Sequence, residues 1–76
     1  MKKLGELKEN SKAVIASLEG DGRFISRITS IGLTPGCSFS VVKNDSKRPM
    51  LIYTRDTLIA LNRKECEGIS VMEEER

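Results

Sequence analysis

The side chains best suited to bind a metal or to attack a substrate are the thiols of Cys37 and Cys66, because the 76-residue sequence contains no histidine. A structural zinc site takes four Cys or His ligands, and histidine is the commonest general base near neutral pH. Two thiols alone complete neither kind of site, and a cytosolic chain does not use them as a disulfide framework. We therefore expect both cysteines to be reduced packing or turn residues, with no bound metal, no cofactor and no enzymatic activity.

One glycine-rich segment, Gly20-Asp21-Gly22, raises the question of phosphate binding. The segment is too short to surround a phosphate and lacks the Gly-Lys-Ser/Thr ending of a P-loop. A serine nucleophile would also need a base, and no histidine is present to supply it. We interpret the segment as a turn followed by a helix cap.

The arginines are the remaining candidates for recognition. Arg23 and Arg27 lie one helical turn apart, and Arg55 falls between two apolar runs. Arginine is enriched at protein interfaces and can bind carboxylates through two hydrogen bonds, although a charged helix face is often simply solvated. Binding surfaces work best on rigid elements, so we predict a partner-binding surface on the helix around residues 23–31 and the turn after it. The residues predicted to form this surface are Arg27, Ser30, Leu33, Thr34 and Arg55.

A short helix must position these side chains. Four apolar residues follow the spacing of one helix face, namely Phe24, Ile25, Ile28 and Ile31. Asp21 is placed to cap the N-terminus of this helix by accepting a hydrogen bond from a free backbone N–H group. The pattern predicts that the apolar face packs on a core and that the charged face points outward.

The helix is predicted to end at Gly32, because glycine readily takes the left-handed conformation that follows many helices. Leu33 is then either the apolar contact that such a helix end makes with Ile28 or an exposed anchor for a partner. Thr34-Pro35-Gly36-Cys37 fits a type II turn, with proline at its second position and a positive φ at Gly36. The chain therefore makes a helix, ends it, reverses, and starts a strand at Cys37.

The rest of the chain is predicted to form short strands separated by turns. Alternating or β-branched apolar runs bounded by turn residues predict strands at residues 12–18, 37–43, 50–54, 57–61 and 68–71. The intervening segments are predicted to be a tight hairpin turn at Arg55-Asp56, a mobile loop at 43–49, one helical turn at 63–66 and a frayed acidic tail at 73–76. The pattern is that of a mostly-β protein of about five strands and one short α-helix, either a small barrel or a sandwich.

The composition predicts one small globular domain over residues 1–76. Hydrophobic residues make up 38% of the chain and charged residues 32%, which is not the composition of a disordered protein. The formal charge of +2 is too balanced to indicate a nucleic-acid partner. No apolar run approaches the roughly 18 residues that span a bilayer, and the N-terminus lacks the apolar stretch of a signal peptide. We expect a cytoplasmic protein without direct membrane insertion.

The helix end and turn also resemble a known signature. The run from Arg27 to Gly36, Arg-Ile-x-x-Ile-Gly-Leu-x-Pro-Gly, is similar to that of the ferrous iron transport protein A (FeoA) family. Ile59-Ala60-Leu61-Asn62-Arg63 and Ile69-Ser70-Val71 resemble later segments of the same family, so the resemblance covers roughly residues 4–72. The chain has Glu9-Asn10 where the family has Pro-Gly, and Asp56 where it often has glycine. Asparagine and aspartate both tolerate positive φ, so we expect both turns to survive.

The resemblance implies a fold and a function. The fold would be a small SH3-like barrel, in which Ile28, Gly32, Pro35 and Gly36 form the structural signature. The function would be that of a small cytosolic accessory protein of bacterial ferrous iron uptake. Such a protein acts by contact with the FeoB-type membrane permease, whose cytosolic end carries a GTP-hydrolysing domain. Whether the chain also forms a weak homo-oligomer stays open.

Two alternative functions remain open. The chain could be a regulatory module like the SH3-like tail of iron-dependent repressors, a role normally fused to a DNA-binding helical domain for which 76 residues leave no room. It could also bind nucleic acid through the basic segment around Lys43, Lys47 and Arg48. Nucleic-acid binding on a small barrel needs stacking aromatic residues, of which this chain has few, and a groove for proline-rich ligands needs them too.

Overall fold

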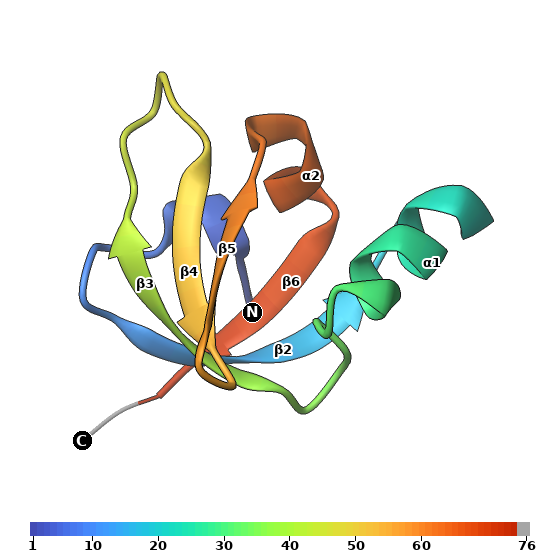
Figure 1. The fold of residues 1–76 in the computed structure, drawn as a ribbon, viewed down its shortest axis with the longest axis horizontal. Helices are drawn as coiled ribbons and strands as arrows, with labels where there is room; N and C mark the ends of the chain where they lie inside the picture. The colour runs from blue at the N-terminus through green and yellow to red at the C-terminus, as the bar shows by residue number, and fades with distance from the viewer. Residues whose placement is uncertain (75–76) are drawn as a thin grey trace.

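The short strands predicted from the sequence assemble into one antiparallel sheet. The computed structural model describes residues 1–74, and its strands follow the order β1-β6-β2-β3-β4-β5 (Figure 1). The strands are β1 (Lys2–Lys3), β2 (Lys12–Leu18), β3 (Ser38–Lys43), β4 (Met50–Thr54), β5 (Thr57–Leu61) and β6 (Ile69–Glu73). The helical segments are the 3-10 turn η1 (Leu4–Glu6), α1 (Gly22–Ser30) and α2 (Arg63–Glu67). The predicted mostly-β, SH3-like fold is confirmed, with one strand more than expected because Lys2–Lys3 pairs with β6.

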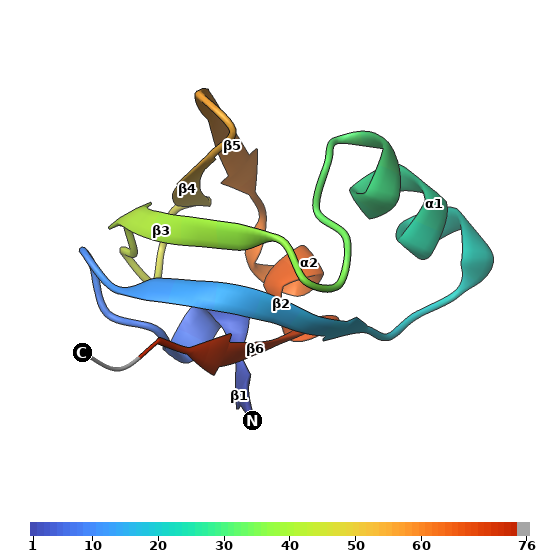
Figure 2. The ribbon, with the colours of Figure 1, turned by 90° about the horizontal axis from the view of Figure 1, so that it is seen from below.

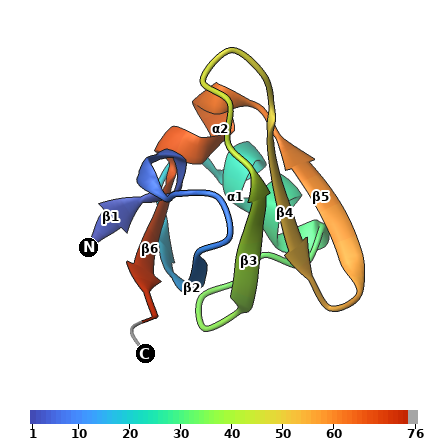
Figure 3. The same ribbon diagram turned by 90° about the vertical axis from the view of Figure 1, so that its left-hand side faces the viewer.

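The sheet curls on itself and encloses the core. β1 and β6 lie on one side and β4 and β5 on the other (Figure 3). The register shifts between Ile15 and Ser17 in β2 and between Val41 and Lys43 in β3. Such bulges bend a strand and increase its twist, so they help the sheet to curl.

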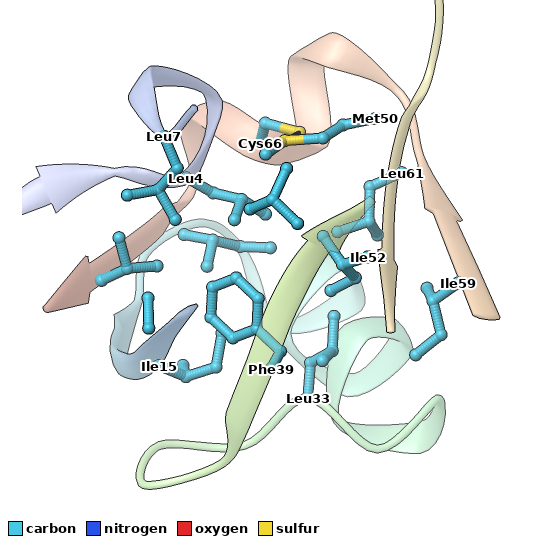
Figure 4. Packing of buried hydrophobic residues seen from close by; sticks show 14 of the residues in the cluster. Leu4, Leu7, Ile15, Leu33, Phe39, Met50, Ile52, Ile59, Leu61 and Cys66 are labelled. Carbon is cyan, nitrogen blue, oxygen red and sulfur yellow. Dashed lines mark hydrogen bonds between the residues drawn. The ribbon is translucent and has the colours of Figure 1, made fainter. Parts of the chain in front are cut away.

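Apolar side chains from all parts of the chain fill the interior, and Figure 4 shows them pointing toward one another. Burial alternates along β3 and β4, as expected for strands with one face on the core. The largest fully buried side chains are Leu4, Leu7, Ile15, Ile28, Leu33, Val41, Met50, Ile52, Leu61, Ile69 and Val71.

The predicted start and end of α1 are both present. The side chain of Asp21 accepts a hydrogen bond of 2.9 Å from the backbone N–H of Phe24. At the other end, Gly32 has φ +101°, its N–H donates to the carbonyl of Thr29, and the N–H of Leu33 donates to the carbonyl of Ile28. These two bonds define the Schellman motif.

The predicted type II turn follows directly. The backbone N–H of Cys37 donates to the carbonyl of Thr34 at 3.0 Å, and Gly36 has φ +91°. A residue with a side chain would be strained in that conformation, so this position favours glycine. The turn delivers the chain to β3.

Helix α1 stands beside the sheet and is held by few side chains (Figures 1 and 2). Ile28 is its one buried residue, and Phe24 packs against the core from a half-buried position. The expectation that Ile31 shares the buried face is wrong, because the side chain is 41% exposed. The helix ends at Ser30, and Ile31 has φ −86° and ψ 2°. Ile31 therefore lies outside the regular helix, and helical spacing does not predict the direction of its side chain.

The β4–β5 hairpin closes at Arg55 and Asp56, whose φ values are +52° and +62°. Positive φ at both central residues is the type I′ geometry that matches the twist of paired strands. Asn10 has φ +72° and makes the turn where the resemblance expects glycine. Both turns therefore survive without glycine.

The loop after β3 is anchored by side chains. The amide of Asn44 donates to the carbonyl oxygens of Gly5 and Leu7. The guanidinium of Arg63 donates to the carbonyl oxygens of Asp45 and Arg48. The segment predicted to be the most mobile loop is thus tied to η1 at its start and to α2 near its end.

The last strand is longer than predicted. β6 continues to Glu73, which pairs with Ala13, and the N–H of Glu74 donates to the carbonyl of Lys12 at 2.9 Å. The predicted frayed tail, residues 73–76, is therefore wrong for Glu73 and Glu74, because β2 is long enough to pair with both. Glu75 and Arg76 lie outside the described residues.

Candidate functional site: the hollow between the two helices

The charged side chain predicted to lie outward on α1 instead pairs with a buried carboxylate. The guanidinium of Arg27 forms an ion pair with Oε2 of Glu65, whose side chain is 7% exposed while that of Arg27 is 60% exposed. Glu65 belongs to α2, so the pair joins the two helices. Because a buried carboxylate is stable only with a charge or hydrogen-bond partner, Arg27 has a structural role as well as an exposed surface.

The other carboxylate oxygen of Glu65 completes the cap of α2. Oε1 accepts a bond of 3.0 Å from the N–H of Asn62, and the side chain of Asn62 accepts one of 2.8 Å from the N–H of Glu65. This reciprocal arrangement is a capping box. Sequence reasoning missed Glu65, although the pattern Asn-x-x-Glu before a helical turn is the signal that could have identified it.

The two helices border an open hollow of about 280 Å³. Three basic and two acidic side chains line it. The full set of lining residues is Asp21, Arg23, Phe24, Arg27, Asn62, Lys64 and Glu65. Asp21 is occupied in capping α1 and Glu65 is paired with Arg27. Glu65 balances Arg27, and Asp21 balances one of the two remaining cations, Arg23 and Lys64, so a net charge of +1 leaves the hollow suited to an acidic group.

The predicted partner-binding residues fall into three different settings. Ser30 is exposed, and its hydroxyl donates to the carbonyl of Ser26 at 2.8 Å, while Thr34 is half-buried. Arg55 is exposed in the hairpin turn and lines a separate hollow along β3 and β4 with Tyr53. Leu33 is completely buried, so it is the apolar contact at the helix end and cannot serve as an exposed anchor.

The signature residues shape the corner that carries these side chains. Ile28 is the buried contact of α1, and Gly32 ends the helix with a positive φ. Pro35 and Gly36 are the two central residues of the turn that reverses the chain. Together they fix where α1 stands relative to the sheet, and so the shape of the hollow.

Residues 2–73 match the FeoA domain family. The chain belongs to the FeoA family. Members of this family are associated with ferrous iron transport, and the match spans all six strands and both helices.

Solved structures support the FeoA assignment and the fold. The chain is similar to a crystal structure titled iron uptake regulatory protein (FeoA), with 21% identity and a TM-score of 0.90, covering 95% of this chain and 96% of that one. It is also similar to the FeoA protein from Chlorobium tepidum, with 28% identity and a TM-score of 0.83, covering 93% of this chain and 69% of that one.

A third solved structure comes from a different class of protein. A manganese-dependent transcriptional repressor in complex with manganese matches 96% of this FeoA-family chain, with 13% identity and a TM-score of 0.88. The match covers 36% of the repressor, so the likeness is one of fold. A search of curated proteins finds no match to the sequence.

Both cysteines of the FeoA-family chain are free and buried. The thiol of Cys37 lies 3.4 Å from the hydroxyl of Thr54, and that of Cys66 lies 3.9 Å from the sulfur of Met50. Burial raises the pKa of the Cys66 thiol. Residues 1–74 contain no group of three or more His, Cys, Asp or Glu side chains placed to hold a metal ion.

The surface of the described part also carries apolar side chains, including Val42, Tyr53, Leu58 and Met72. Tyr53 and Leu58 are directly opposite each other on β4 and β5. Among residues 1–74, no helix has the length and apolar character needed to cross a bilayer.

Proposed function

We propose that this FeoA-family chain is a cytosolic, non-enzymatic accessory protein of bacterial ferrous iron uptake that acts by contact with an FeoB-type permease. The observation that carries the proposal is the family match over residues 2–73. A solved relative with 25% identity is titled iron(II) transport protein A. The contact would support assembly or activity of the transporter, and iron would be the cargo of the permease.

The proposed contact surface combines α1 with the tip of the β4–β5 hairpin. Ser30 and Thr34 lie at the C-terminal end of α1 and just beyond it, and Arg55 is exposed at the hairpin tip. Arg27 contributes its exposed part beside Arg23 in the hollow. An arginine on a rigid element can bind a partner carboxylate through two hydrogen bonds, so we expect acidic residues on the permease side.

Binding of the purified chain to the cytosolic part of an FeoB-type permease tests this function. Arg55→Glu reverses an exposed charge, and Ser30→Glu places a carboxylate on the same surface, so each variant would repel the acidic residues expected on the permease. We expect each variant to weaken binding about tenfold with little change in stability, since surface substitutions usually stay within about 0.5 kcal/mol.

Lys47→Glu is the matched control, because Lys47 is an exposed cation in the loop after β3. It should bind as the unmodified chain does. Normal binding by Arg55→Glu and Ser30→Glu together with loss in Lys47→Glu would move the contact surface to that loop. Absence of any permease binding, or recovery of nucleic acid in its place, would reject the function.

A further inference from the structure

Strand β5 forms one edge of the sheet, and its free side is open. In residues 1–74 its one neighbour in the sheet is β4, with Thr54 opposite Thr57 and Ile52 opposite Ile59. In a hairpin closed by a two-residue turn, the residues flanking the turn exchange hydrogen bonds, and bonded pairs then alternate along the ladder. The N–H and C=O groups of Leu58 and Ala60 therefore point away from β4.

These backbone groups are accessible. Leu58 is 57% exposed, Ala60 is exposed, and no backbone group outside the β4–β5 ladder bonds to either residue within the described chain. Each residue thus offers one donor and one acceptor along the edge. An unpaired edge of this kind is a template for another strand.

The opposite edge of the sheet lacks these features. β1 is only two residues long, and both are lysines. Lys2 pairs with Glu73 at 2.8 Å and Lys3 pairs with Glu19 at 3.2 Å. Short length and charged lysines are devices that keep an edge from pairing, and β5 has neither, because residues 57–61 carry no charge and no proline.

The surroundings of β5 define what fits there. In Figure 3, β5 lies at the outer end of the sheet, with β4 on its inner side. Asn62 directly follows β5 and lines the hollow that contains Arg23 and Lys64. At this end of the strand an acidic residue would meet the net charge of +1 that three cations and two carboxylates give the lining of the hollow.

We propose that β5 binds an extended segment of the partner protein as an additional strand, with an apolar side chain over Leu58 and an acidic residue at the end next to Asn62. Main-chain hydrogen bonds to an exposed edge provide affinity in this recognition mode, and the side chains provide specificity. The proposal rests on the function proposed above, since the partner is the cytosolic part of the FeoB-type permease.

A second copy of this chain fits the edge less well. Antiparallel pairing of two β5 strands would bring the Arg55 end of one strand toward the Lys64 end of the other. The Arg55 end of each strand would also lie toward the hollow of its partner, whose lining has a net charge of +1. Like charges placed opposite each other across a sheet are destabilising, so an acidic segment is favoured over a second copy.

Residue-resolved amide hydrogen exchange of the chain, alone and bound to the permease's cytosolic part, tests the proposal without any substitution. The amides of Ile59 and Leu61 already donate to β4, so their protection should change little. The amides of Leu58 and Ala60 should exchange at least tenfold more slowly in the complex.

A pair of substitutions at one position provides the binding test. Ala60→Pro removes the outward N–H without removing a bond to β4, a position where edge strands tolerate proline, and it should weaken binding at least tenfold. Ala60→Val keeps the N–H and suits a strand, so it should bind nearly normally. Lys64→Glu should weaken binding, whereas Lys47→Glu should not.

The outcomes separate this proposal from the function. Binding without added protection at Leu58 and Ala60, or equal binding by Ala60→Pro and Ala60→Val, would overturn the strand proposal and leave the function standing. Absence of binding would overturn both. Protection of the two amides that rises with the concentration of the chain alone would assign the edge to a second copy and overturn the proposal.

Discussion

Helices α1 and α2 are held against the sheet in opposite ways. α2 has five residues but buries Glu65 and Cys66 and packs against η1. α1 has nine residues but buries only Ile28. Both helices have a capping side chain at the N-terminus, so capping does not explain the difference. Since tertiary packing supplies most helix stability in proteins, the shorter helix is part of the core and the longer one is left with most of its surface free.

Breaking the link between the helices should have the largest effect. Arg27→Glu places a carboxylate against the buried carboxylate of Glu65. Leaving a buried charge without its partner costs about 3–5 kcal/mol. Because the Arg27 side chain is 60% exposed and solvent screens its charge, we expect a loss at the lower end of this range, about 3 kcal/mol, in the free energy of unfolding, measured by chemical denaturation.

This substitution therefore does not report on partner contact alone, although the sequence pattern predicts that the charged face of the helix points outward. Arg23→Glu, one turn earlier on the exposed side of α1, is the control and should change stability by no more than about 0.5 kcal/mol. Equal losses in the two variants would mean that the ion pair does not join the helices.

A substitution in the turn that follows α1 should have the next largest effect on stability. Gly36→Val introduces a β-branched side chain where φ is +91°. Left-handed conformations cost about 1–2 kcal/mol for ordinary residues, and a β-branched residue should cost at least as much. We expect a lower midpoint of thermal unfolding, with Gly22→Ala as the control because an added Cβ there meets no atom within 4 Å. An unchanged midpoint for Gly36→Val would contradict the turn geometry.

Removing the two caps tests the comparison between the helices directly. Asn62→Ala and Asp21→Ala each remove a side chain that accepts a bond from the third residue of its helix, a loss of about 1 kcal/mol. Because α2 belongs to the core, Asn62→Ala should lower global stability. Asp21→Ala should mainly speed amide exchange within α1. Equal effects on global unfolding would show that α1 is as firmly held as α2.

The smallest expected effect concerns the buried thiol of α2. Burial raises the pKa of Cys66 above its ordinary value of 9.0; Glu67 also raises it, whereas Arg63 lowers it. The unfolded thiol then ionises at a lower pH than the folded one, so the unfolded state binds fewer protons in this range and stability falls with pH. The stabilisation is complete below pH 9.0 and is lost as the pH rises through the folded pKa.

Denaturation midpoints measured across this alkaline range test the prediction. The decline should be shallower in Cys66→Ala, which lacks the titrating thiol, whatever its starting stability. A decline of the same slope in both proteins would assign the alkaline loss to other groups.

Local stereochemistry made most of the fold predictable from the sequence. Asp21, Gly32 and Gly36 each have a conformation or hydrogen bond that depends on nearby residues alone, and all three occur as expected. Arg55-Asp56 likewise forms the predicted hairpin turn, because the apolar runs on either side set its position.

The candidate site was less predictable because it depends on contacts distant in sequence. Arg27 and Glu65 are 38 positions apart, and nothing in either local pattern indicates that they meet. Leu33 was ambiguous for the same reason, since only the packed core decides that it is buried. The short strand β1 was missed because two lysines carry no strand pattern, and pairing with β6 alone defines it.

The position of β6 between β1 and β2 has a consequence for how fast the chain can fold. β3, β4 and β5 are consecutive and need only short loops to meet, whereas β2 pairs with β6 across more than fifty residues of chain. Closing such a loop costs conformational entropy before any of its contacts form, and contacts between distant residues slow two-state folding. The β3–β4–β5 meander is therefore the part that can assemble first, and attachment of the C-terminal strand limits the rate. During synthesis β6 emerges after the other five strands, so β2 stays without this neighbour until then.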